Sequence, residues 1–167
     1  MDFELSVSPS LRREMPVISD CSTMEVAVPE VSTAAPSVLL LDDDAELANV
    51  YRIALEERGF SVSIASNGAI GLQQVVARDF DVILCDIVMP HLPGNMFYLA
   101  VRKAKPYLCD RFLFITGHRH DSESGHFLQH VDALVLYKPV RIDDLVGSIS
   151  LVLARSKNRC DFRLRIG

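Results

Sequence analysis

The sequence predicts an α/β fold, a doubly wound sheet of five parallel strands flanked by helices on both faces. Short, uninterrupted apolar runs recur along the chain from Val38 onward, as in strands that are covered on both faces. Stretches with helical periodicity separate these runs, and alternation of strand and helix is typical of a parallel sheet with helices on both sides. Crossovers in such a sheet are expected to be right-handed.

The first strand and helix are the most clearly marked. Residues 38–41 are a continuous apolar run, and residues 45–58 carry one apolar stripe at helical spacing. Gly59 is placed to end that helix. Residues 60–65 are rich in β-forming side chains and predict the second strand.

A turn and two polar-ended segments mark the middle of the chain. Asn67-Gly68 indicates a turn into a second helix, which runs through Arg78. Residues 82–85 form the third apolar run, which ends at Asp86. Residues 94–105 are expected to be helical, because Pro106 cannot continue a helix.

The last elements complete the alternation. Residues 112–115 predict the fourth strand, residues 122–130 a short polar helix, and residues 133–137 the fifth strand. The final helix opens with Asp143 and Asp144, whose charges suit a helix N-terminus. Its apolar positions through Leu153 are expected to face the core.

The two ends of the chain differ from this pattern. Residues 1–36 scatter prolines among serine, threonine and acidic residues without lasting periodicity, so they predict a disordered leader. Residues 37–155 form the predicted folded domain, and residues 156–167 a short basic tail. Both segments are expected to be solvated. The alternatives are that the leader docks to a partner protein and that the tail contacts a partner or an anionic surface.

Composition narrows the class of protein. The formal net charge of −5 offers no general footprint for nucleic acid, and no apolar run approaches the roughly 18 residues of a membrane span. The segment before Val38 lacks the apolar core of a secretory signal. The four cysteines, Cys21, Cys85, Cys109 and Cys160, show neither CxxC nor zinc-ligand spacing. Free thiols in a reducing cytoplasm are the expectation.

Polar side chains stand where the predicted strands end. Asp42 and Asp43 follow the first strand, Asp86 the third, Thr116 the fourth and Lys138 the fifth. Ligands of such sheets bind beyond the carboxyl ends of the strands, so these side chains are expected to share one rim. Neighbouring carboxylates are natural oxygen ligands for Mg²⁺, and a lysine and a hydroxyl suit phosphoryl oxygens. A carboxylate can also be the nucleophile that forms an aspartyl-phosphate.

The same residues carry a family resemblance. VLLLDDD at 38–44, DIVMP at 86–90 with Gly94, FLFIT at 112–116 and YKP at 137–139 resemble the receiver domain of two-component response regulators. Thr116 follows Asp86 by 30 residues and Lys138 follows Thr116 by 22, which suits that family. Four motifs in order are far more specific than any one of them. The resemblance covers about residues 37–155 and implies a flavodoxin-like sheet with strand order 2-1-3-4-5.

The resemblance also implies a role for each acidic residue of the rim. Asp86 would be the phosphorylated residue. Asp42, Asp43 and Asp86, with the main-chain carbonyl of Val88, would bind Mg²⁺. The donor would be a phosphohistidine on a sensor histidine kinase or a phosphotransfer protein.

The switch residues follow from the same resemblance. Thr116 would hydrogen-bond the phosphoryl group, Lys138 would pair with it, and Pro139 would follow a cis peptide bond. The charge change would shift the face formed by the last two helices and the fifth strand, which a downstream protein would then contact. Family members usually carry an aromatic residue three positions before the lysine, where this chain has Val135. Pro93 also replaces a frequent acidic residue.

Other interpretations use some of the same residues. Asp44 suits a helix N-cap, although a cap needs one carboxylate rather than three. A Mg²⁺-dependent phosphatase of the haloacid dehalogenase type would use Asp42, Asp44, Thr116 and Lys138, but it leaves Asp86 without a role. A receiver-like interaction module that takes no phosphate is a third possibility. The histidines His118, His120, His126 and His130 offer a weak zinc pattern without a clear third ligand.

The sequence therefore predicts a bacterial, cytoplasmic, single-domain response regulator that is phosphorylated on Asp86 with Mg²⁺ and is not an enzyme. Its predicted partners are a kinase or phosphotransfer protein and a downstream protein, with neither nucleic acid nor membrane. The sequence does not decide between a monomer and a homodimer, because apolar positions on several helices suit both.

Overall fold

A computed structural model describes residues 34–117 and 122–164, with side-chain surroundings for 34–117 and 125–157. The predicted leader lies outside the described residues except for its last three positions. Within the described residues, no helix is both long and apolar enough to cross a bilayer.

A five-stranded parallel sheet forms the centre of the fold, in the order β2-β1-β3-β4-β5. This confirms the predicted α/β class and strand order. The strands are β1 (Ser37–Leu41), β2 (Ser61–Ala65), β3 (Val82–Asp86), β4 (Phe112–Thr116) and β5 (Leu134–Tyr137).

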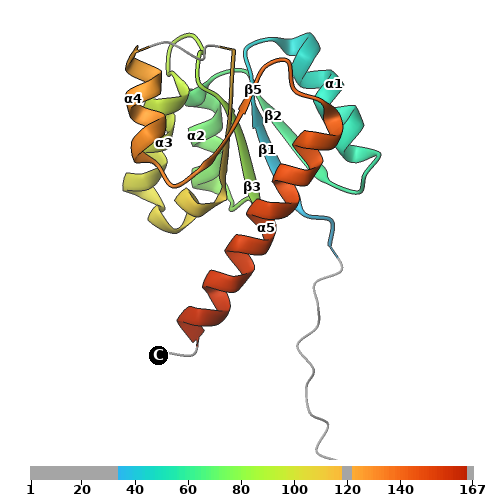
Figure 1. Ribbon diagram of the computed structural model, residues 1–167, viewed down its shortest axis with the longest axis vertical. Helices are drawn as coiled ribbons and strands as arrows, with labels where there is room; N and C mark the ends of the chain where they lie inside the picture. Colours follow the sequence, from blue (N-terminus) through green and yellow to red (C-terminus); the bar gives the residue numbers. More distant parts are fainter. Residues whose placement is uncertain (1–33, 118–121, 165–167) are drawn as a thin grey trace, which may run out of the picture. The chain divides into compact units, whose positions relative to one another are not determined.

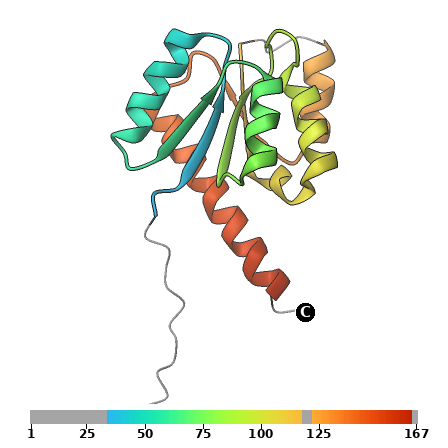
Figure 2. The same cartoon turned by 180° about the vertical axis from the view of Figure 1, so that it is seen from behind.

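Helices cover both faces of the sheet (Figure 1). α1 and α5 lie on one face, and α2, α3 and α4 lie on the other, as the reverse view also shows (Figure 2). The helices are α1 (Ala45–Glu56), α2 (Gly68–Ala77), α3 (Gly94–Ala104), the 3-10 helix η1 (Pro106–Arg111), α4 (Ser122–His130) and α5 (Ile142–Leu164).

Two apolar cores follow from the alternation of side chains along the strands. In β1, Leu39 and Leu41 pack into the core beneath α2 and α3. Val38 and Leu40 point to the opposite face and pack against α1 and α5. A strand that serves two cores has to be apolar at every position, which is why its sequence is a continuous run rather than an alternating one.

Local signals set the helix boundaries. Asp44 caps α1 by accepting hydrogen bonds from the backbone N–H groups of Glu46 and Leu47, at 3.0 and 3.1 Å. Gly59 adopts a φ of +84°, a conformation that side chains disfavour, so the chain reverses there after α1. Both features agree with the sequence.

Two segments differ from expectation. Pro106 ends α3 as predicted, but the chain then tightens into η1, which carries Leu108 into the core. Proline suits the first turn of a helix because it needs no hydrogen-bonded N–H there. α5 continues to Leu164, so residues 156–164 of the predicted tail belong to this helix.

Candidate functional site

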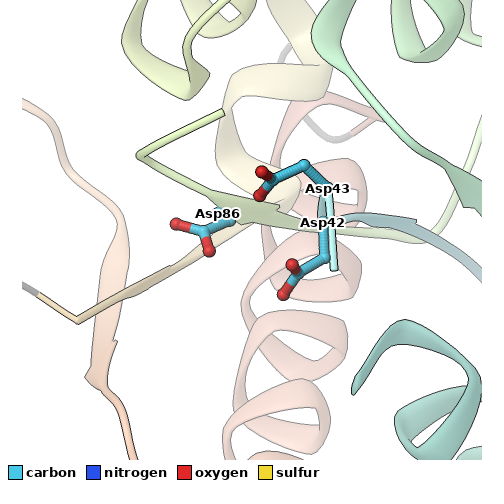
Figure 3. A group of neighbouring side chains, drawn as sticks. All are labelled: Asp42, Asp43 and Asp86. Atoms are coloured by element: carbon cyan, nitrogen blue, oxygen red, sulfur yellow. The ribbon is translucent and has the colours of Figure 1, made fainter. Parts of the chain in front are cut away.

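The carboxyl ends of the strands bring the predicted acidic residues together. Asp42 and Asp43 directly follow β1, and Asp86 is the last residue of β3, the neighbouring strand. One carboxylate oxygen from each of the three lies within 4.8 Å of the others. Figure 3 shows the three carboxylates gathered at this edge. Asp42 and Asp86 are buried, whereas Asp43 is exposed.

Lys138 joins the two buried carboxylates. Its Nζ lies 3.0 Å from Asp42 Oδ2 and 2.5 Å from Asp86 Oδ2. The lysine follows β5, at the far end of the sheet order from β2, so its side chain reaches across the rim. Three residues that are distant in the sequence thus form one ion-paired cluster.

Each buried carboxylate divides its two oxygens between backbone and lysine. Asp42 Oδ1 accepts from the backbone N–H of Asp44 at 2.9 Å, and Asp86 Oδ1 accepts from that of Val88 at 2.9 Å. These local bonds fix the orientation of both side chains and turn each Oδ2 toward Lys138. The predicted part of the Val88 carbonyl in metal binding stays a prediction.

Thr116 is held beside Lys138 by the backbone. It is the fully buried last residue of β4, and its carbonyl accepts from the Lys138 N–H at 2.8 Å. In the strand register, Asp86 of β3 pairs with Ile115, the residue before Thr116 on β4. The peptide bond between Lys138 and Pro139 is cis, as expected.

Burial and charge oppose each other at this site. Burial raises the pKa of Asp86 above its ordinary value, and hydrogen bonds from Lys138 and Val88 offset part of that rise. Burial would lower the pKa of Lys138, but its bonds to Asp86 and Asp42 outweigh this effect and raise it. An ion pair alone would lower the aspartate pKa, so the raised value reflects removal of the carboxylate from water.

The charges and spacing of the rim suit a divalent cation. Three carboxylates against one ammonium leave two negative charges, which one such ion would neutralise. One oxygen of each carboxylate lies within 4.8 Å of the other two, so all three can reach a single ion after small side-chain movements. Oxygen donors are also the ligands that Mg²⁺ prefers.

Comparison with known proteins agrees with this geometry. Residues 38–150 match the family described as "Response regulator receiver domain". The chain belongs to this family. Receiver domains bind Mg²⁺ at an acidic pocket, and the matched span of this chain contains an aspartate cluster.

Curated relatives of this receiver include stand-alone and multidomain proteins. The response regulator receiver protein CpdR of Brucella abortus (strain 2308) is 32% identical over 116 residues, which cover 70% of this chain and 95% of CpdR. The sensor kinase CckA of the same strain is 26% identical, with 85% of this chain covering 15% of that protein. The DNA-binding transcriptional regulator NtrC of Rhizobium meliloti (strain 1021) is 31% identical, with 74% of this chain covering 25% of NtrC.

Solved structures show the same fold. The chemotaxis protein CheY4 of Vibrio cholerae has a TM-score of 0.65 and 29% identity, covering 72% of this chain and all of CheY4 (100%). A CheY-like receiver domain protein of Methanospirillum hungatei JF-1 has a TM-score of 0.69 and 25% identity, covering 75% and 98% of the two chains.

The structure gives Tyr51 a relation to the site that the sequence did not reveal, and it shows how closely Gly94, which follows the DIVMP motif, approaches Asp86. Tyr51 was expected only on the core stripe of α1, yet burial raises its pKa and the charges of Lys138, Asp42 and Asp86 act on it. A Cβ on Gly94 would lie 2.3 Å from the Asp86 carbonyl oxygen. Helical periodicity shows which face is buried, but it does not show which charges lie beneath that face.

The zinc hypothesis gains no support within the described residues. His118 and His120 lie outside them, and His130 Nδ1 hydrogen-bonds the backbone carbonyl of His126 at 2.7 Å. Among the residues described, the group with metal-ligand spacing is the aspartate cluster.

A separate hollow of about 530 Å³ lies between α2 and the loop after β3. Its lining is mainly apolar and shares no residue with the rim. The lining residues are Ala69, Leu72, Gln73, Val76 and Leu92.

Proposed function

We propose that this receiver accepts a phosphoryl group on Asp86 from a phosphohistidine of a sensor histidine kinase or a phosphotransfer protein. The observation that carries the proposal is the ion-paired cluster of Asp42, Asp86 and Lys138, with Asp43 beside it. It combines a carboxylate that can act as nucleophile, a cation for the transferred group and oxygen donors for a metal.

The transfer would be a single displacement at phosphorus. A carboxylate oxygen of Asp86 forms the new P–O bond, and the P–N bond to the donor imidazole breaks. The imidazole nitrogen keeps the electron pair of that bond and takes up a proton. The backbone N–H of Val88 holds Asp86 Oδ1 throughout, which supports attack through Oδ2, the oxygen now bound to Lys138.

Charge neutralisation is the main requirement of this chemistry. Asp42, Asp43 and Asp86, with the Val88 carbonyl, would hold Mg²⁺, which neutralises phosphoryl oxygens when bound. The Lys138 ammonium, already at Asp86 Oδ2, would pair with a further phosphoryl oxygen. The Thr116 hydroxyl would donate to another from the end of β4.

The output of the site would be a change of protein contacts rather than catalytic turnover. Movement of Thr116 toward a phosphoryl group would shift the surface of α4, β5 and α5, which a downstream protein would recognise. We further propose a cytoplasmic location and a signalling unit spanning residues 37–155. Self-association of this surface would produce a homodimer.

Incubation with acetyl phosphate and Mg²⁺, followed by intact-protein mass spectrometry, tests the proposal. We expect wild type to gain one phosphoryl group and Asp86→Asn to gain none. Asp143→Asn, which removes a carboxylate that is 77% exposed at the start of α5, is the matched control and is expected to be labelled like wild type. Labelling that persists in Asp86→Asn would reject Asp86 as the acceptor.

The same experiment separates this function from a phosphatase of the haloacid dehalogenase type. That mechanism would need the carboxylate of Asp44 at the reacting centre, whereas Asp44 Oδ1 binds the N-terminus of α1. Repeated hydrolysis of p-nitrophenyl phosphate that survives Asp86→Asn and is lost in Asp42→Asn would favour the phosphatase.

A further inference from the structure

Three aromatic rings connect the strand of Thr116 to α4. Phe114 of β4 lies two residues before Thr116, Tyr98 belongs to α3, and Phe127 belongs to α4. Their ring centroids form a closed triangle: Phe114 to Tyr98 is 5.9 Å, Tyr98 to Phe127 is 5.5 Å, and Phe114 to Phe127 is 5.5 Å. All three pairs have an edge-to-face geometry, which is the favoured one for aromatic side chains. We call these residues the ring triangle.

Two corners of the ring triangle are fixed. Phe114 is fully buried, and Val135 of β5 is its partner in the strand register. Tyr98 is 7% exposed and packs edge-on against Phe112 at 5.0 Å. Tyr98 therefore leaves little room for Phe114 to shift toward α3 when the end of β4 moves.

Phe127 is the most exposed corner of the ring triangle. It is half-buried, whereas Phe114 and Tyr98 are buried. Side chains of α4 and the turn after it, namely Phe127, Leu128 and Val131, attach this segment to the core. Edge-to-face rings occupy discrete arrangements, so a shift of β4 is passed to Phe127 as a change of ring packing rather than as a gradual deformation.

We propose that Phe127 is a positioning residue that couples α4 to the phosphoryl site through Phe114. This inference rests on the proposed function, since it concerns how occupancy of Asp86 is transmitted. In the unphosphorylated protein, the ring triangle holds α4 and the end of β4 in one arrangement. In this proposal, occupancy of the site rearranges that contact, so linkage requires that weakening the contact tightens the binding of a phosphoryl analogue.

The test measures the dissociation constant of beryllofluoride with Mg²⁺ in four proteins. Phe127→Leu removes the ring but keeps an apolar side chain, and we expect it to bind beryllofluoride about fivefold more tightly, the low end of allosteric coupling. Phe127→Tyr restores a ring and is expected to bind with the wild-type affinity. Leu128→Val, which trims the neighbouring side chain in the same core, is the control for loosening of α4 and is expected to leave the affinity unchanged.

A second measurement needs no variant. Hydrogen exchange of α4 amides is compared in the wild type with and without beryllofluoride and Mg²⁺, and we expect faster exchange in the loaded protein. A wild-type beryllofluoride affinity for Phe127→Leu, a tightened affinity for Leu128→Val, or α4 exchange that is unchanged by the ligand would overturn the coupling. Failure of wild type to be labelled at all would instead refute the proposed function.

Discussion

Gly94, the first residue of α3, is a position where any added side chain is predicted to destabilise the fold. A Cβ there would lie 2.3 Å from the Asp86 carbonyl oxygen, 2.9 Å from Cys85 Sγ and 3.0 Å from Ile87 Cα. Ordinary contact begins at 3.4 Å, so α3 and the end of β3 would have to separate by about 1 Å. The Gly94 N–H also donates to the Ile87 carbonyl at 3.0 Å, which ties the two segments together.

The expected magnitude follows from two opposing effects. Overpacking that moves backbone costs about 1–3 kcal/mol. Alanine is the better helix former by up to about 1 kcal/mol, although this gain is smaller in the first turn of a helix. We therefore expect Gly94→Ala to lower the free energy of unfolding by about 1–2 kcal/mol. Because the displaced atoms include Asp86 itself, labelling by acetyl phosphate should slow as well.

Gly147→Ala is the matched control. Gly147 is an exposed residue of α5 whose added Cβ would meet nothing within 4 Å. Here only the helix preference acts, and we expect stabilisation by about 0.5–1 kcal/mol. Urea unfolding followed by circular dichroism measures both variants, with an unchanged m-value as evidence that the unfolded state is comparable. If Gly94→Ala were as stable as Gly147→Ala, the close approach of α3 to Asp86 would be wrong.

Three further predictions concern the charged groups. Mg²⁺ at a hundred times its Kd should stabilise wild type by about 2.7 kcal/mol in thermal unfolding, and Asp42→Asn should lose most of this gain; equal stabilisation of both proteins would exclude the rim as the metal site. Asp44→Ala removes the α1 cap and should cost about 1 kcal/mol without changing the labelling of the acceptor, and lost labelling would contradict a purely capping role. Hydrogen bonds from the side chains of Lys105 and Tyr107 lower the pKa of Asp79, and this effect outweighs the rise that its partial burial causes. Its ionised form therefore stabilises the fold above the unfolded pKa of about 3.9, and the stability difference between wild type and Asp79→Asn should vanish as pH falls through the lower folded pKa; a difference that grows in acid would contradict this sign.

Local sequence patterns were sufficient to predict the strands and most helix bounds, and to predict which residues lie at the carboxyl edge of the sheet. Four strands of the sheet were visible as apolar runs and β2 by its β-forming side chains, and Asp44 and Gly59 marked the limits of α1 by their own chemistry. The rim residues were found because each one directly follows or ends a strand. In a parallel sheet all such positions lie on the same edge, so topology converts sequence positions into neighbours.

The contacts between those neighbours required the tertiary structure. No periodicity shows that Lys138 binds Oδ2 of both Asp42 and Asp86, or that Gly94 faces the Asp86 carbonyl. The continuation of α5 to Leu164 was also missed, because a basic, weakly periodic segment resembles a solvated tail.

The amino-acid sequence by itself determined which segments form strands and helices and which side chains stand at the strand ends, because these depend on short-range periodicity and capping. The folded structure decided the distances: the shared lysine, the division of carboxylate oxygens and the ring triangle that joins β4 to α4. Such distances arise from the packing of segments that are far apart in the chain, so local sequence patterns do not determine them.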